Sequence, residues 1–329
     1  MRKVSTKKIT SIGGSALIEG IMMRGPKRTT VCVRTGENEI YSEDIKITTI
    51  PEKCKLFKLP LLRGIAGLID SMRLSYKSLM LSADKAVEAG EVEEEEPSKF
   101  EKWLDEKFGD KLVKVIMVFA SILGVALAVG LFFFLPSFLF DLTANVVPVF
   151  QGNGESAVFW KSVFEGVLKI ALFLGYSVLC SQMTEMKRVF MYHGAEHKTI
   201  FCYENEEELT VENVRKQIRF HPRCGTSFMV LMLIVGIVIG LFIPVAPFGI
   251  GFLRPVFKIL LLPVSCGIGY ELIKICGKHD NAFTRVIAAP GLWAQRITTK
   301  EPDDKMIEVA IEAMKAVIPD DGTDIINNK

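Results

Sequence analysis

The residues from Val115 to Phe140 form a run of 26 residues without a charged side chain. As a helix this run would be about 39 Å long, against roughly 30 Å for the hydrocarbon core of a bilayer. With 49 % apolar residues among 329, the chain is also too hydrophobic for an ordinary soluble protein. We therefore expect a mainly α-helical integral membrane protein whose principal partner is the lipid bilayer.

Three further apolar segments would complete a bundle of four transmembrane helices. Residues 225–253 are free of charge, although Pro244 and Pro247 predict an early end to their helix. Residues 159–184 and 255–276 have uncharged centres and charges near their ends. We expect those end charges to extend to the membrane interface, because long side chains can keep a charged tip in water.

Lys161, Glu165 and Lys169 in the second span are spaced four residues apart and so share one helix face. One interpretation is an intramembrane path for an ion or a substrate, because charges at depth are costly and often mark function. The other is a ladder of ion pairs that extends to the outer interface. We favour the ladder, since these residues lie near one end of the span.

Lys and Arg are concentrated next to particular span ends, which predicts the orientation. They precede the first span and follow the second, at Lys107, Lys111, Lys114, Lys187, Arg188, Lys198, Arg215, Lys216, Arg219 and Arg223. We therefore expect both termini and the loop 185–224 on the cytoplasmic side. Seven cysteines, an odd count without framework spacing, agree with a reducing compartment.

The soluble segments are expected to be helical apart from a small region at the start. Residues 29–34 and 39–49 alternate apolar side chains around a turn, which predicts a β-hairpin. The expected regions are 1–59, glycine-rich with the hairpin; 60–112, amphipathic or interfacial helices with an acidic linker at 88–97; 113–276, the transmembrane domain; and 277–329, a helical cytoplasmic tail.

The glycine-rich residues 13–26 suit a close backbone approach or a loop near a ligand. They contain neither of the common glycine-rich phosphate-binding motifs. Glu19 and Arg24 are the candidate functional side chains of this segment.

His193, Glu196 and His197 follow the order H-x-x-E-H. On a helix, residues three and four apart lie on one face, so both imidazoles can reach one metal ion. This order is that of the inverzincin metalloproteases. The spacing predicts a divalent metal, zinc above all, with Glu196 beside it.

His221 and Cys224 lie in the same predicted cytoplasmic loop, three residues apart, and can supply further ligands. A site made of His193, His197, His221 and Cys224 would be fully coordinated. Such closed sites are structural, because no position remains for water.

An open site is the alternative. Glu204 or Glu271 could then provide a carboxylate ligand, leaving one position for a water molecule with Glu196 as general base. Arg223 could bind an anionic group of the substrate. Under this arrangement the protein would be a hydrolase of unknown substrate.

A non-enzymatic role is the second hypothesis. Several amphipathic segments and a hairpin are all expected on the cytoplasmic side, where they could bind a protein partner in membrane-protein biogenesis. Basic blocks interleaved with aromatic residues are missing from the sequence, so we expect no nucleic-acid partner. The oligomeric state does not follow from the sequence.

Four motifs resemble the YqhQ-like family of bacterial membrane proteins. They are IEGIMMRGP at 18–26, HGAEHKTIFCYE at 193–204, HPRCGTSF at 221–228 and PGLWAQRITTKEPDDKMIEVAI at 290–311. The family is labelled a predicted metal-dependent enzyme, and its principal domain is one of unknown function. The resemblance implies a multi-pass protein of the bacterial cytoplasmic (inner) membrane, with a metal at the matching positions His193, Glu196, His197, His221 and Cys224.

Overall fold

A computed structural model describes residues 7–46, 48–59, 62–90, 115–116, 118–144, 146–151, 154–278 and 281–328. Most of the acidic linker 88–97, and with it Lys107, Lys111 and Lys114, lies outside these residues. The chain divides into two compact units. We call Met1–Val92, Phe173–Val235 and Pro263–Lys329 the mixed unit, and Glu93–Leu172 with Gly236–Leu262 the helical unit.

The mixed unit contains a four-stranded antiparallel sheet, ordered β2 (Gly13–Leu17), β3 (Gly20–Arg24), β4 (Thr29–Arg34) and β5 (Ile40–Asp44). The predicted hairpin is confirmed as β4 and β5. The glycine-rich segment, expected as a loop or a close backbone approach, forms the hairpin β2–β3. Glu19 in its turn has a positive φ of 48°.

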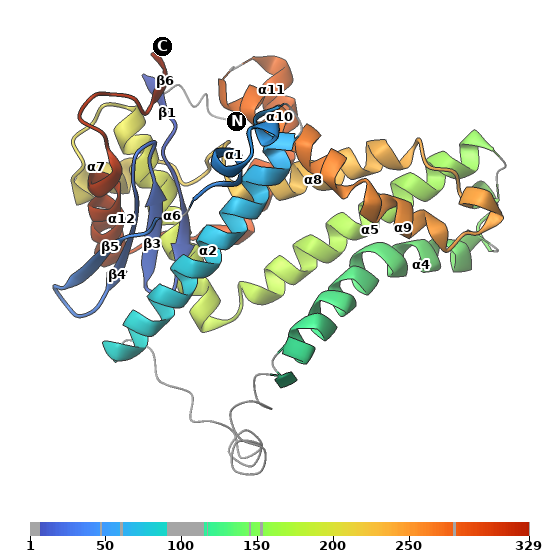
Figure 1. The fold of residues 1–329 in the computed structure, drawn as a ribbon, viewed down its shortest axis with the longest axis horizontal. Helices are drawn as coiled ribbons and strands as arrows, with labels where there is room; N and C mark the ends of the chain where they lie inside the picture. The colour runs from blue at the N-terminus through green and yellow to red at the C-terminus, as the bar shows by residue number, and fades with distance from the viewer. Residues whose placement is uncertain are drawn as a thin grey trace, which may run out of the picture. The chain divides into compact units, whose positions relative to one another are not determined.

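Both faces of this sheet are covered by helices (Figure 1). On one face Ile21 and Cys32 pack against α6 (Thr184–Glu204) and α12 (Asp304–Val317). On the other face Val31 and Val33 pack against Leu74 of α2 (Leu62–Glu88). Because both faces of β3 are buried, its apolar residues are consecutive. A half-exposed strand would instead alternate apolar and polar residues.

The buried side chains of α2 are mostly small, apart from Leu74 on the sheet and Asp70, while several large apolar side chains are exposed. Its buried positions include Ala66, Ser78 and Ala86, at multiples of four residues. Met72 and Tyr76 are 64 % and 68 % exposed. The predicted amphipathic helix is therefore present, and its large apolar stripe remains uncovered by the described residues.

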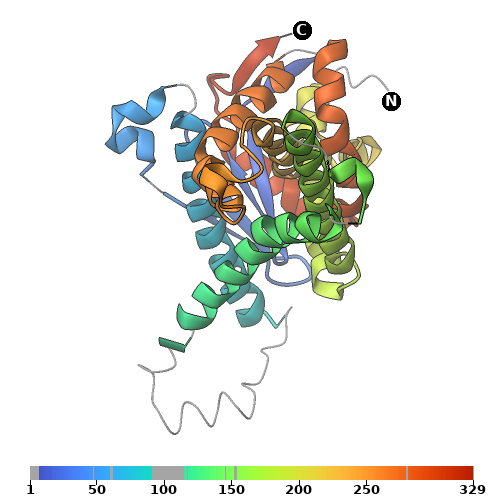
Figure 2. The ribbon, with the colours of Figure 1, turned by 90° about the vertical axis from the view of Figure 1, so that its right-hand side faces the viewer.

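The two chain ends are joined in the mixed unit. Strand β1 (Lys8–Thr10) pairs antiparallel with β6 (Ile325–Asn328), as Figure 1 and Figure 2 show. The region predicted as a helical tail, 277–329, thus contains a strand at 325–328, which corrects that prediction there. The pairing is reinforced where Thr10 donates its hydroxyl to Asp324 at 2.7 Å.

Further elements of the mixed unit are α1 (Ile50–Lys53), η1 (Lys55–Lys58), α7 (Val211–Lys216) and α11 (Ala282–Thr298). Thr210 caps α7 by accepting a hydrogen bond from the Asn213 N–H, as its residue type predicts. Pro290 and Gly291 predict a turn by their residue types, but α11 continues through both. The glycine allows a close contact there, since a Cβ on Gly291 would lie 2.6 Å from Ser227.

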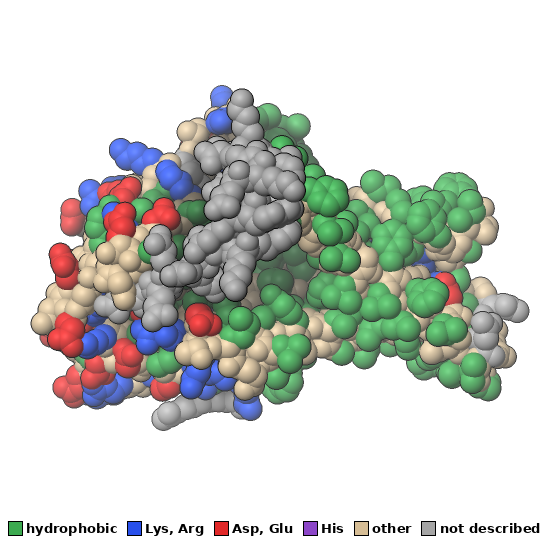
Figure 3. Space-filling view, turned by 90° about the horizontal axis from the view of Figure 1, so that it is seen from below, with side chains coloured by type: hydrophobic (Ala, Val, Ile, Leu, Met, Phe, Trp, Pro, Cys, Tyr) green, Lys and Arg blue, Asp and Glu red, His purple; other side chains and the backbone are tan. Residues whose placement is uncertain are grey.

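Two helical stretches are long and apolar enough to cross a membrane, Val118–Ala144 and α5 (Glu155–Cys180). The first contains a π-helical turn, η2 (Gly130–Phe134), before α4 (Leu135–Ala144). A third candidate is the pair α9 (Leu253–Leu260) and α10 (Leu262–Lys278), which is bent by 46°. Hydrophobic side chains dominate the surface of the long helices in the space-filling view (Figure 3).

The fourth expected span is represented by a shorter apolar helix, α8 (Gly225–Gly240). It ends before Pro244, as the prolines predict, and is followed by η4 (Pro247–Gly249). A further short helix, η3 (Pro148–Phe150), lies between the first two spans. The described residues thus form a mainly helical protein with two or three candidate spans.

Candidate metal centre

His193, Glu196 and His197 lie on α6, on one face of the helix, as their spacing predicts. The two imidazole ring centroids are 4.4 Å apart. Helix α6 packs beside α12 on one face of the sheet, inside the mixed unit. His197 is 1 % exposed and Glu196 is 5 % exposed.

Cys224 completes a group of three possible metal ligands. One donor atom from each of His193, His197 and Cys224 lies within 4.8 Å of the other two. The Nε2 atom of His193 is 3.1 Å from the Cys224 Sγ. Cys224 immediately precedes α8, so the start of that helix brings the thiol to α6.

Both imidazoles are held in one tautomer by backbone carbonyls. His193 Nδ1 lies 2.8 Å from the carbonyl oxygen of Thr298, and His197 Nδ1 lies 2.6 Å from that of Arg219. A carbonyl oxygen can only accept, so each Nδ1 must carry the proton and donate it. Each ring therefore directs its other nitrogen, Nε2, away from the carbonyl, and His193 Nε2 meets the Cys224 sulfur. A metal-ligating histidine usually has this arrangement, with one ring nitrogen donating to a carbonyl and the other binding the ion.

The three groups favour the ionised thiol. Burial alone would raise the pKa of Cys224, but His193 and His197 hold the pKa of that thiol well below its ordinary value. Burial would likewise lower the pKa of His193, whereas the Cys224 thiolate, Glu196 and the Thr298 carbonyl raise it to about 9. A thiolate is the form of cysteine that binds metals.

Glu196 has an unsatisfied oxygen next to this group. Among the described residues its buried Oε2 has no hydrogen-bond partner. Burial raises the pKa of Glu196, while His193 and His197 oppose that rise. The N–H of Gly14 donates to the carboxylate, and a Cβ on Gly14 would lie 3.0 Å from the Glu196 Cδ. The glycine-rich segment therefore does make a close backbone approach.

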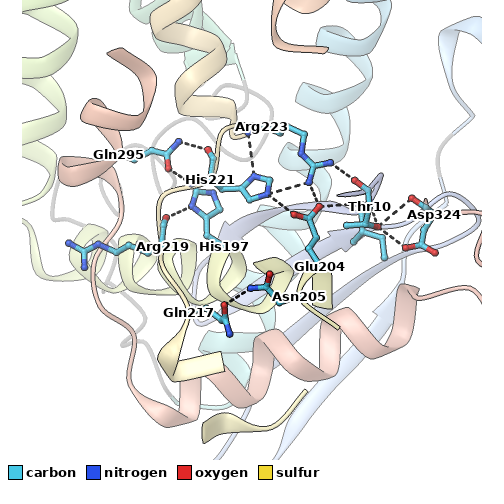
Figure 4. Close-up of polar contacts among 11 residues, drawn as sticks. Thr10, His197, Glu204, Asn205, Gln217, Arg219, His221, Arg223, Gln295 and Asp324 are labelled. Carbon is cyan, nitrogen blue, oxygen red and sulfur yellow. Dashed lines mark hydrogen bonds and ion pairs between the residues drawn. The ribbon is translucent and has the colours of Figure 1, made fainter. Parts of the chain in front are cut away.

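His221 lies beside the group but faces a different network (Figure 4). Its Nδ1 accepts the N–H of Arg223 at 3.3 Å, and its Nε2 is 4.0 Å from the Glu204 Oε2. Gln295 donates to the His221 carbonyl at 2.7 Å and accepts the His221 N–H at 2.8 Å. Burial, Arg223 and His197 lower the pKa of His221 well below its ordinary value, so the ring is neutral.

Glu204 and Arg223 are paired with one another in that network (Figure 4). Arg223 also donates to the Thr10 carbonyl, and Glu204 accepts the Thr10 N–H at 2.9 Å. Asp324 accepts from Tyr203 at 3.0 Å and extends the network to the C-terminal strand. Glu204 was a candidate metal ligand and Arg223 a candidate anion-binding residue. Here the two side chains instead link the strands at the chain ends to α6.

The other candidate residues lie apart from the three donors. Glu19 accepts from Arg188 and, at 3.2 Å, from the Tyr192 hydroxyl. Glu271 is paired with Arg63 of α2. Arg24 is the last residue of β3.

Sequence reasoning missed the residues that orient the site. The Thr298 carbonyl fixes the His193 ring, and Gln295 fixes the backbone of His221. Every residue has a backbone carbonyl, so the residue type of Thr298 does not indicate this role. The sequence singled out Thr298 and Gln295 only as members of the motif PGLWAQRITTKEPDDKMIEVAI.

The fold and the site define a mainly helical protein with candidate membrane spans and a His/His/Cys group in which His197 and Cys224 are buried. The chain belongs to the family described as "protein of unknown function (DUF1385)", whose model matches residues 59–320. It is 33 % identical over 308 residues to "Uncharacterized protein YqhQ" of Bacillus subtilis (strain 168), covering 93 % of this chain and 92 % of that protein. The resemblance to the YqhQ-like family is thereby confirmed. No solved structure matches the chain.

Proposed function

We propose that this protein is a membrane protein that binds one divalent metal ion, zinc, through His193, His197 and Cys224. The observation that carries the proposal is that both imidazoles donate Nδ1 to a backbone carbonyl, while one donor atom from each of the two rings and Cys224 lies within 4.8 Å of the other two. Two imidazole nitrogens and one thiolate form a donor set that zinc prefers. The unpartnered Oε2 of Glu196 fits a cation at the same place.

The reaction that this arrangement supports best is hydrolysis. A zinc ion bound there would activate water and polarise a carbonyl or phosphoryl group. Glu196 would supply the general base, since its Oε2 lacks a partner among the described residues and lies on the same helix face as the histidines. Three protein ligands leave one of four tetrahedral positions for water, as in catalytic zinc sites.

A structural metal is the second candidate, and the burial of the site favours it. Cys224 is 7 % exposed and His197 is 1 % exposed. The two histidines lie on α6, and their hydrogen-bond acceptors lie in the segment before α8 and at the end of α11. A metal there would fix three distant segments, and the protein would be a non-enzymatic membrane factor with a protein partner.

For the membrane topology we propose four crossings with both termini in the cytoplasm. The third crossing would be α8 and the fourth the bent pair α9–α10. The Lys and Arg residues between α5 and α8 support a cytoplasmic position for the metal centre. A reporter fused after Gly154 should behave as external, and cytoplasmic activity of that fusion would contradict this topology.

The metal proposal is tested by metal analysis of the full-length protein purified in detergent. We expect one zinc per chain, and an X-ray absorption spectrum with one sulfur and two imidazole neighbours. His193→Ala and Cys224→Ala should lose the metal, whereas Glu196→Gln should keep it. Glu271→Gln is the matched control, because that carboxylate is paired with Arg63. A wild-type protein that binds no zinc after reconstitution would overturn the proposal.

The choice between an open and a closed site needs a separate measurement. Cobalt substituted for zinc gives a visible spectrum that depends on the coordination. Addition of acetohydroxamate should change this spectrum if a fourth position is open. An unchanged spectrum would favour the structural metal, while leaving the three ligands in place.

A further inference from the structure

Charged side chains are buried between the helices of the helical unit. Lys161 and Glu165 of α5 are 0 % and 2 % exposed, and Arg254 and Lys258 of α9 are 0 % and 9 % exposed. Each pair is spaced four residues apart, so each helix presents one charged face. For these two spans the sequence predicts charged side chains that extend to the membrane interface. The four side chains are instead enclosed by neighbouring helices.

The charged residues of α5 also lie farther from the end of the helix than a ladder of ion pairs at the membrane interface would. Lys169 lies about 21 Å along this 26-residue helix, close to its midpoint. Charges in the middle of an apolar span are costly and usually mark a function.

The basic groups outnumber the acidic ones. Lys161 is paired with Asp141, and Lys258 is paired with Glu165. With Arg254 and Lys169 the cluster has four cations against two carboxylates, an excess of two positive charges. We call these six residues the basic cluster.

Arg254 is partly compensated by the end of α8. It donates to the carbonyl oxygens of Gly240 and Pro244 at 3.1 and 2.9 Å, and to the Ser162 hydroxyl at 2.7 Å. The last carbonyls of a helix carry about half a negative charge, which leaves an excess of between one and two. Arg254 Nε and Glu165 Oε1 lie 3.6 Å apart and both lack a hydrogen-bond partner among the described residues.

Lys169 is the cation that no described carboxylate pairs with. Its ammonium lies 4.5 Å from the centre of the Phe133 ring. Phe133 belongs to the π-helical turn η2, and such turns occur frequently at functional sites. Lys169 is half-buried, so its three N–H donors remain open to a ligand.

We propose that the basic cluster binds a phosphate-type oxyanion, brought either by an anionic lipid headgroup or by a free phosphate. The excess charge matches an anion of one or two negative charges. The ammonium groups of Lys169 and Lys258 provide donors of the kind that bind phosphate as point charges. This site lies in the helical unit and is independent of the proposed metal.

The binding test uses the full-length protein, delipidated in dodecyl maltoside. In one arm inorganic phosphate is titrated, and in the other a short-chain phosphatidylglycerol is titrated. Thermal unfolding and native mass spectrometry are the measurements, because a ligand that binds the folded protein raises its unfolding temperature. A shift with the lipid alone assigns the headgroup, and a shift with phosphate alone assigns the free anion.

Lys169→Met is the decisive variant, because it removes the unpaired cation without leaving a carboxylate unpartnered. We expect binding at least about tenfold weaker, equivalent to about 1.4 kcal/mol. Lys315→Met, in the exposed face of α12, is the matched control and should bind as the wild type does. Glu165→Gln should change affinity in the opposite direction, because it increases the positive excess.

Two results would overturn the proposal. One is a wild-type protein that neither shifts nor retains either probe up to millimolar concentration. The other is a Lys169→Met protein that binds as tightly as the wild type and the Lys315→Met control.

Discussion

Gly194 of α6 lies against the backbone of Lys300, and a Cβ on Gly194 would be 2.0 Å from the Lys300 carbonyl oxygen. The Lys300 N–H donates to the Phe190 carbonyl at 2.8 Å in the same contact. This close approach brings the end of α11 within reach of His193, whose Nδ1 donates to Thr298. A glycine at 194 therefore positions one ring of the metal centre.

We expect Gly194→Ala to destabilise the protein by about 1–3 kcal/mol, the usual cost of overpacking. The extra methyl meets backbone, which cannot move aside as a flexible side chain would. Gly175→Ala in α5 is the control, because a Cβ there meets nothing within 4 Å and alanine favours a helix. Thermal unfolding in detergent measures both, and equal midpoints would contradict the prediction.

His221→Ala should retain the metal. Its ring nitrogens face Arg223 and Glu204, so its loss removes no member of the group of three donors. His197→Ala should lose the metal. Zinc content measured after dialysis of both variants decides between three ligands and four. Loss of zinc from His221→Ala would show that the fourth expected ligand takes part.

Arg223→Ala should cost about 3–5 kcal/mol, because it removes the arginine that is paired with the buried Glu204 carboxylate. The double change Arg223→Met with Glu204→Gln should cost clearly less, since no charge is then left unpaired. The glutamine oxygen can still accept the Thr10 N–H. Denaturant unfolding of the three proteins gives the coupling energy, and additive effects would contradict the pairing.

Removal of the metal should expose the Cys224 thiol to reagents. Metal coordination blocks the thiolate, whereas the pKa shift leaves it reactive once a chelator has removed the ion. Cys54 is an exposed free cysteine and serves as the internal control, since it should be labelled in both states. Mass spectrometry of labelled peptides measures the ratio. Equal labelling of Cys224 with and without chelator would argue against coordination by this thiol.

Local spacing was sufficient to predict that part of the candidate metal centre shares one helix face. His193, Glu196 and His197 lie on one helix face because an α-helix repeats every 3.6 residues. Cys224 was found by residue type alone. The direction of the His221 ring could not be found in this way, since it depends on Arg223 and Glu204 after the chain has folded.

The sheet shows the same limit. Ile21, Met22 and Met23 form one apolar run because α12 and α2 cover opposite faces of β3, and no alternation remains to be recognised. The long spans were predicted from residue content, because hydrophobicity over about 20 residues is itself the physical cause of insertion. The interior position of Glu165 could not be predicted from the sequence, since its partner Lys258 lies 93 residues away.

The ladder between β1 and β6 has a consequence for topology. Residues 8–10 and 325–328 are hydrogen-bonded to one another, so these two strands near the chain ends lie side by side. A path that starts and finishes on one side makes an even number of crossings. The four crossings proposed above are even in number and keep the two paired strands together, whereas a path of three crossings would separate them.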